Sequence, residues 1–180
     1  MKTVLVLGAG HQKLKRLDTT RHTISSPITD GRELNEVIWS VDIEPETKPD
    51  TVHDLERLPW PLPSSEFDEV HGYEILEHLG QQGDFRAFFA HFGELWRVLK
   101  SGGRLFASVP CHDSVWTFGD PGHTRVINAG SLVFLCRAQY AKQLGHSAMS
   151  DYRRYLVGDW VIEYQRIIGE SFCFVLRAVK

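Results

Sequence analysis

The stretch VLVLGAGHQK, residues 4–13, is the part of the sequence that most constrains the fold. Its first four residues, Val4–Leu7, are apolar, and they lead directly into Gly8, Ala9 and Gly10. A short run that is apolar on both faces predicts a buried strand of a parallel sheet, because helices cover both faces of such a sheet. Glycines after a strand let the backbone approach a ligand closely, where any side chain would block it. The stretch therefore predicts a strand followed by a ligand-binding turn.

The composition of the whole chain is that of an ordinary globular protein. Its 180 residues suit one domain, so we expect a single domain over residues 1–180. Hydrophobic residues make up 42% of the chain and charged residues 24%, which argues against wholesale disorder. The formal net charge of -3 argues against tight binding of nucleic acid through its phosphates.

Cysteine usage and hydropathy bear on the cellular compartment. Cys111, Cys136 and Cys173 are far apart and odd in number, so they indicate thiols in a reducing compartment rather than a disulfide framework. The N-terminal apolar run is too short for a signal peptide, and no apolar run reaches the length that spans a membrane. We therefore expect a cytoplasmic protein that does not associate with membranes.

Outward from the first stretch, strand and helix signals alternate along the chain. The segment 85–100 is the clearest helix, because its apolar residues follow helical spacing and Asp84 is a suitable N-cap. Asn128 is placed to cap a second helix that ends near residue 144, and residues 12–31 are expected to form a loop with at most one short helix. The predicted strands are residues 4–7, 36–42, 50–53, 67–72, 104–109, 159–168 and 171–179. This order predicts an α/β fold, a Rossmann-like doubly wound, mainly parallel seven-stranded sheet with an antiparallel C-terminal hairpin.

Polar residues follow the predicted strands at the edge where an open parallel sheet binds its ligands. Asp42 ends the second strand, and a carboxylate there is able to accept hydrogen bonds from both hydroxyls of a ribose. A strand-ending aspartate also caps turns in many proteins, so glycines and Asp42 alone leave a nucleoside ligand and a simple turn both open.

Four further segments carry a more specific pattern: HDLERLPWP at 53–61, FDEV at 67–70, LEHL at 76–79 and RVLKSGGRL at 97–105. In this order and spacing they resemble the class I S-adenosylmethionine-dependent methyltransferases, with Ser101 in place of a proline. The resemblance extends from Val4 to Val109. It implies S-adenosylmethionine as the cofactor and methyl transfer to an unidentified acceptor as the reaction. The near-neutral charge of the chain favours a small molecule or a modest glycan-like substrate as that acceptor over a long nucleic acid.

The resemblance also implies which residues contact the cofactor. The implied contacts are Gly8, Ala9, Gly10, Tyr73 and Glu74 near the methionine moiety, Asp42 at the ribose, Asp54 with the Leu55 backbone at the adenine, and Ile43, which is not assigned to one part of the cofactor. The chain departs from the family pattern at Val6, where an acid is usual, and at Gln12, which replaces a third glycine. We therefore expect a reshaped pocket at the methionine end, with His11 or Gln12 as possible polar contacts.

Histidines after the fifth strand are candidates for catalysis. His112 and His123 are the predicted general bases, because histidine titrates near neutral pH. The competing interpretation is that both are surface residues with hydrogen-bonding roles, and that Glu77 and His78 serve packing at a helix start. The sequence contains no HxxxH pair and no Cys/His cluster with ligand spacing, so no metal site is predicted.

Two other functions stay open at this level. A binding or scaffold protein on the same fold would explain Val6 and Gln12. A nicotinamide-dependent oxidoreductase would explain the glycines and Asp42, but not the four further segments. The oligomeric state is not predicted.

Overall fold

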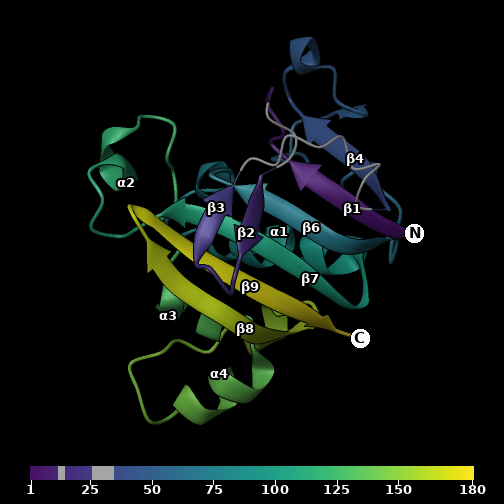
Figure 1. Cartoon of the computed structure of the whole chain (residues 1–180). Helices are drawn as coiled ribbons and strands as arrows, with labels where there is room; N and C mark the ends of the chain where they lie inside the picture. Colours follow the sequence, from purple (N-terminus) through teal and green to yellow (C-terminus); the bar gives the residue numbers. More distant parts are fainter. Residues whose placement is uncertain (12–14, 26–34) are drawn as a thin grey trace.

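The computed structural model of the protein describes residues 1–11, 15–25 and 35–180, and Figure 1 shows the arrangement of its elements. The strands are β1 (Lys2–Leu7), β2 (Arg16–Asp18), β3 (Thr23–Ser25), β4 (Glu36–Asp42), β5 (Thr51–Val52), β6 (Phe67–Tyr73), β7 (Leu99–Pro110), β8 (Asp159–Ile168) and β9 (Ser171–Val179). The α-helices are α1 (Phe85–Val98), α2 (Trp116–Gly119), α3 (Ala129–Val133) and α4 (Arg137–Gln143). Short 3-10 helices include η3 (Leu76–His78), which directly follows β6.

The large sheet has the strand order β5-β4-β1-β6-β7-β9-β8. β1 pairs in parallel with β4 and β6, whereas β9 is antiparallel to both β7 and β8. This confirms the expected seven-stranded α/β sheet, mainly parallel with an antiparallel C-terminal hairpin. The strand order changes direction between β1 and β6, and an open sheet binds its ligands at such a point.

One face of the sheet packs against apolar helices. Phe88, Phe89, Phe92 and Leu95 of α1 are buried there together with the apolar residues of the central strands, which confirms the predicted stripe. The Asp84 side chain caps the helix by accepting the Ala87 N–H at 3.0 Å, as expected. The helix ends at Val98 rather than at residue 100, because the next residue already has the extended backbone of β7.

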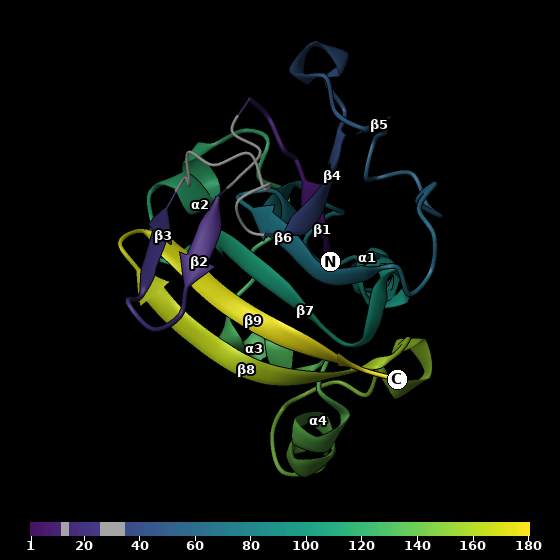
Figure 2. The same ribbon diagram turned by 45° about the vertical axis from the view of Figure 1, so that its right-hand side comes forward.

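The opposite face carries the hairpin formed by β2 and β3 (Figures 1 and 2). Leu17 and Ile24 pair across the hairpin and pack against Tyr73, Cys173 and Val175 of the sheet. The expectation of a loop with a short helix is therefore wrong for residues 15–25. Within the described residues, the hairpin covers this face where a doubly wound sheet ordinarily carries helices.

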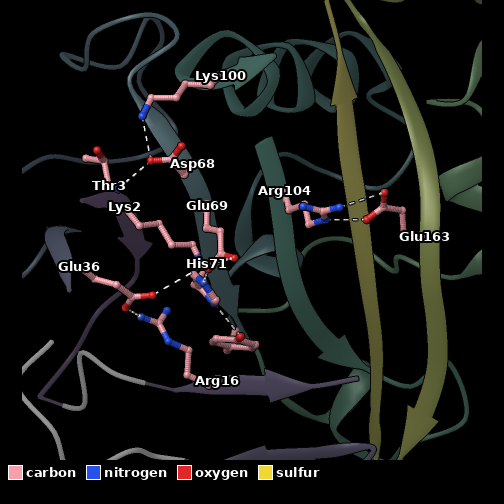
Figure 3. A network of polar contacts seen from close by, with 11 residues as sticks. Lys2, Thr3, Arg16, Glu36, Asp68, Glu69, His71, Lys100, Arg104 and Glu163 are labelled. Carbon is pink, nitrogen blue, oxygen red and sulfur yellow. Dashed lines mark hydrogen bonds and ion pairs between the residues drawn. The ribbon is translucent and has the colours of Figure 1, made fainter. Parts of the chain in front are cut away.

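Charged side chains line the same face beneath the hairpin (Figure 3). Lys2 Nζ lies 2.5 Å from Glu69, and Arg16 of the hairpin lies 2.6 Å from Glu36. The Glu69 carboxylate also accepts a hydrogen bond from His71 Nε2 at 3.1 Å. Burial alone would raise the pKa of Glu69, but the hydrogen bonds from His71 and Lys2 outweigh it and lower this pKa to about 2. The charges on this face are thus paired with one another.

The segment after β7 differs in detail from the expected single helix. Asn128 begins α3 with a capping box to Ser131, as expected, but α3 ends at Val133. A separate helix, α4, begins after Cys136, whose extended backbone interrupts the helical path. No helix in the described parts of the chain is long and apolar enough to cross a membrane.

Candidate functional site

The glycine turn after β1 has the backbone shape that glycine adopts most readily. Gly8 and Gly10 both have positive φ, at +56° and +51°. A Cβ added to Gly8 would lie 2.8 Å from Ile75, whereas one added to Gly10 would meet none of the described residues within 4 Å. Gly8 therefore allows Ile75 to pack against the turn, and Gly10 presents the open side on which a ligand finds bare backbone.

Asp42 joins this turn to the end of β4. Its Oδ2 accepts the Gly10 N–H at 2.7 Å and its Oδ1 accepts the Glu44 N–H at 2.9 Å. The residue is 8% exposed. An ionised carboxylate has about four acceptor positions, so two remain after these bonds. Asp42 therefore fixes the turn and keeps acceptor capacity for a ligand.

Asp54 lies near the end of β4, because the N–H of its neighbour His53 donates to the Asp42 carbonyl at 2.9 Å. The Asp54 carboxylate accepts the Glu56 N–H at 3.0 Å and lies 3.4 Å from Arg57 Nε. The side chain of Leu55 is buried, and its carbonyl accepts the Trp60 indole N–H at 2.9 Å. These bonds fix the loop that contains both predicted adenine contacts.

Ile43, next to Asp42, is a large apolar residue at the surface. It is 65% exposed, which is unusual for an isoleucine directly after a buried strand end. Its side chain offers an apolar surface beside the turn.

A cavity of about 240 Å³ lies at the glycine turn. It is lined by Val6, Leu7, Gly8, Ala9, Gly10, His11, Lys15 and Tyr73. The lining thus includes the glycine turn and Tyr73 from the predicted set. It also includes Lys15, a cation that the sequence did not single out for the pocket, and the apolar Val6. Gln12 lies outside the described residues.

Tyr73 forms the wall of this cavity through a chain of hydrogen bonds. Its hydroxyl accepts the Leu17 N–H at 2.8 Å and lies 2.8 Å from His71 Nδ1. Burial lowers the pKa of His71, so the ring is neutral and its Nε2–H donates to Glu69. His71 Nδ1 is then the acceptor for the Tyr73 O–H. The hairpin and β6 hold the tyrosine in one orientation.

Glu74 stands at the carboxyl end of β6 in a left-handed conformation, with φ of +53°. Its Oε1 accepts hydrogen bonds from Ser108 Oγ at 2.6 Å and from Ser171 Oγ at 2.9 Å. Two neighbouring strands, β7 and β9, therefore hold this carboxylate in place.

Glu77, in η3, is buried without any such partner. The residue is 2% exposed, and neither carboxylate oxygen has a hydrogen bond to residues 1–11, 15–25 or 35–180. Burial raises the pKa of Glu77 to about 8, and the negative charges of Glu74 and Asp120 add to this shift. The His123 Nε2 lies 3.8 Å from Glu77 Oε1. The interpretation of Glu77 as a packing residue missed this pairing, which nothing in the spacing of the two residues indicates.

The two histidines predicted as bases lie in different clusters. His123 contacts Glu77, and its ring meets that of His78 edge to face with centroids 4.7 Å apart. His112 is exposed beside Cys111 and lines another cavity, of about 460 Å³, with residues of α3, β8 and β9. The structure therefore brings His123, and not His112, to a buried acid.

Comparisons with known proteins bear on the fold. No family model matches the sequence, and no curated protein matches it in sequence. Solved structures do match. A SAM-dependent methyltransferase from Archaeoglobus fulgidus is 14% identical, with a TM-score of 0.57 over 98% of this chain and 86% of that one. One from Methanosarcina mazei is 15% identical, with a TM-score of 0.58 over 98% and 92%.

A third similar structure was solved with ligands bound. It is the 1,6-didemethyltoxoflavin-N1-methyltransferase of Burkholderia thailandensis, with 1,6-didemethyltoxoflavin and S-adenosylhomocysteine. It is 15% identical, with a TM-score of 0.58 over 99% of this chain and 71% of that one. The chain described here therefore has the fold of the class I S-adenosylmethionine-dependent methyltransferases.

Proposed function

We propose that the protein binds S-adenosylmethionine at the glycine turn and catalyses transfer of its methyl group to a small acceptor. The observation that carries this proposal is the Asp42 carboxylate, which is tied to the Gly10 N–H at 2.7 Å and still has two acceptor positions. A pair of ribose hydroxyls supplies the two donors that match them.

The other predicted contacts surround that point. Gly10 offers bare backbone beneath the methionine moiety, and the exposed Ile43 offers an apolar surface to the adenine. The Asp54 carboxylate is available at the same edge of the sheet to accept a hydrogen bond from the adenine amino group. The cavity is lined both by Val6, where the family usually has an acid, and by Lys15. The ammonium of Lys15 is able to pair with the methionine carboxylate.

The cofactor, when bound, supplies a methyl group on a positive sulfonium. The protein has to align the acceptor with that methyl and exclude water, and good alignment contributes several kcal/mol. A base is needed where the acceptor carries a proton that must leave. His123 is the stronger candidate for this base, because it lies beside the buried acid Glu77 near the end of β6. His112 instead lines a different cavity.

A small acceptor fits the chain better than a nucleic acid. The net charge of -3 gives no broad basic surface for phosphates. The similar Burkholderia thailandensis enzyme was solved with a small heterocyclic compound bound, which supports the same class of acceptor here.

Calorimetric titration tests the proposal. S-adenosylmethionine and S-adenosylhomocysteine are expected to bind the wild-type chain, and Asp42→Ala is expected to weaken binding at least about tenfold, since a hydrogen bond to a charged group contributes about 1.5–3 kcal/mol. Asp18→Ala is the matched control, because Asp18 also accepts two backbone N–H groups but lies on the hairpin. Its binding is expected to equal that of the wild type.

Two outcomes would overturn the proposal. No binding of either compound at millimolar concentration would favour a scaffold protein on this fold. Preferential binding of a nicotinamide dinucleotide would favour an oxidoreductase.

A further inference from the structure

A second cluster of chemically active side chains lies beyond the glycine turn, where η3 meets the loop after α2. Glu77, His78 and His123 each bring one ligand-type atom to within 4.8 Å of the other two. The Glu77 carbonyl accepts the backbone N–H groups of Thr124 and Arg125, both at 3.0 Å. The loop that carries His123 is therefore fixed against η3 by backbone hydrogen bonds.

The hydrogen bonds of the two histidines determine where their protons lie. His78 Nδ1 is 2.9 Å from the Gly122 carbonyl oxygen, and His123 Nδ1 is 2.8 Å from the Trp116 carbonyl oxygen. A carbonyl oxygen only accepts, so each Nδ1 carries a proton and donates it. In the neutral rings, each Nε2 then has a free lone pair. Metal-binding histidines commonly show this arrangement, in which the second ring nitrogen donates to a backbone carbonyl.

Glu77 adds a carboxylate oxygen that lies within 4.8 Å of a ring nitrogen of each histidine. It is 2% exposed, and neither of its oxygens has a hydrogen-bond partner among the residues that the structure describes. A buried carboxylate without a partner is costly, and a nearby cation removes that cost. The 3.8 Å between Glu77 Oε1 and His123 Nε2 is too long for a hydrogen bond. It is close to the separation of two ligands of one tetrahedral ion, since ligand atoms about 2.0–2.2 Å from a shared ion lie about 3.3–3.6 Å apart.

We infer that Glu77, His78 and His123 form a binding site for a divalent transition-metal ion of the Zn²⁺ type. One carboxylate with two imidazoles is the donor set of several catalytic zinc sites, which keep a further position open. Asp120 Oδ2, also 3.8 Å from His123 Nε2, stands at the rim as a possible additional ligand. Soft thiolates are absent from this set, which distinguishes it from a structural Cys-rich zinc site.

The place of the site in the fold suggests what an ion there does. Glu77 lies two residues after Ile75, which packs directly on Gly8 of the cofactor turn. An ion at this point would bind an oxygen of the acceptor and lower the pKa of its hydroxyl, whose proton would then leave to solvent because His123 Nε2 would be bound to the ion. This step rests on the proposed function. It implies that the methyl acceptor belongs to the class of compounds that carry a hydroxyl group.

Metal titration of the chelator-treated protein tests the site without any cofactor present. Co²⁺ is the probe, because its visible absorption reports the ligand set, and Zn²⁺ is then added in competition. One equivalent is expected to bind. Glu77→Gln and His123→Asn are each expected to weaken binding by at least about 10–100-fold, the loss that even changes outside the ligand shell cause.

Two controls accompany these variants. His146→Asn removes an exposed histidine elsewhere, and His112→Asn alters the other group of ligand-type residues, Cys111, His112 and Asp113. Both are expected to bind Co²⁺ as the wild type does. If Glu77→Gln fails to fold, His78→Asn and the Co²⁺ spectrum of the wild type decide the question.

Three results would overturn the inference. They are no binding at millimolar Co²⁺ or Zn²⁺, binding that survives both Glu77→Gln and His123→Asn, and loss of binding in His112→Asn. Because the titration needs no S-adenosylmethionine, a negative result here leaves the proposed function standing. A failure to bind S-adenosylmethionine equally leaves the metal site testable.

Discussion

Two regions of the sheet differ in whether the chain provides hydrogen-bond donors for a carboxylate that is shielded from water. At the glycine turn, Asp42 accepts two backbone N–H groups, and nearer the start of β6 the partly buried Glu69 is paired with Lys2 and His71. Beyond β6, Glu77 is more deeply buried, and among the described residues neither of its carboxylate oxygens has a hydrogen bond. The pKa of Glu69 is lowered to about 2, whereas that of Glu77 is raised to about 8. Burial acts on both acids, so the difference lies in the donors that the chain itself provides.

This difference separates the carboxylates that stabilise the fold from a carboxylate that does not. Asp42 and Glu69 hold the turn and the cavity wall in place whether or not a ligand is bound. Glu77 forms no side-chain hydrogen bond within the described residues, so His123 at 3.8 Å, a bound proton or a bound cation has to compensate its charge.

The largest expected effect concerns the pH dependence of stability in chelator-treated protein. A carboxyl with a raised pKa in the folded state binds its proton more tightly when folded, so stability falls as pH rises from about 4.5 to about 8. The contribution is on the order of 4 kcal/mol. Glu77→Gln lacks this loss, so urea unfolding at a series of pH values should show the two proteins diverging toward alkaline pH. Parallel curves would mean that Glu77 is solvated or paired.

A somewhat smaller effect is expected at Glu69, with the opposite sign of pH dependence. A carboxyl with a lowered pKa stabilises the fold above its unfolded value, and this stabilisation is lost as pH falls from about 4.5 toward 2. Glu69→Gln is expected to lower the free energy of unfolding by about 2 kcal/mol at pH 7, a modest loss because Lys2 is partly exposed and water screens the pair. The loss is expected to be much smaller at pH 3, because the stabilisation by the Glu69 carboxylate decreases there in the wild type as well.

Glu163→Gln serves as the control for this variant. Glu163 pairs with Arg104 on the same face (Figure 3) and also with Arg177, in a more exposed ion-pair cluster. Its loss is expected to cost less than about 1 kcal/mol. Equal costs for the two variants would show that the burial of Glu69 adds nothing.

The smallest expected effects distinguish the two glycines of the turn. Gly8→Ala places a Cβ 2.8 Å from Ile75 at a positive φ and is expected to cost about 2 kcal/mol, whereas Gly10→Ala meets open space and costs about 1 kcal/mol. Thermal unfolding measures this order. Both glycines line the cavity, so both variants are expected to weaken cofactor binding, and unchanged affinity in both would contradict the assignment of the cofactor to this turn.

Much of the fold was predictable, because its strands carry local signals. The segments 36–42, 159–168 and 171–179 were predicted with the bounds that the structure has. The hairpin of β2 and β3 was missed, because strands of three residues are too short to show a periodic pattern. Its packing depends on Leu17 and Ile24 meeting strands that are distant in the sequence.

The site was predictable only in its first half. Gly8, Gly10 and Asp42 follow strand ends, where sheet topology alone indicates a ligand. The pairing of Glu77 with His123 has no such signal, because α1, β7 and α2 separate the two residues along the chain. Their approach depends on the backbone bonds between the Glu77 carbonyl and the loop after α2.

A crystal structure with S-adenosylhomocysteine bound is the most direct test of the proposed cofactor site. The ribose hydroxyls should lie within hydrogen-bond distance of the Asp42 carboxylate, with the adenine beside Ile43 and Asp54 and the sulfur toward the end of β6. A ligand bound elsewhere, or a ribose turned away from Asp42, would contradict the assignment of this edge as a methyl-transfer site.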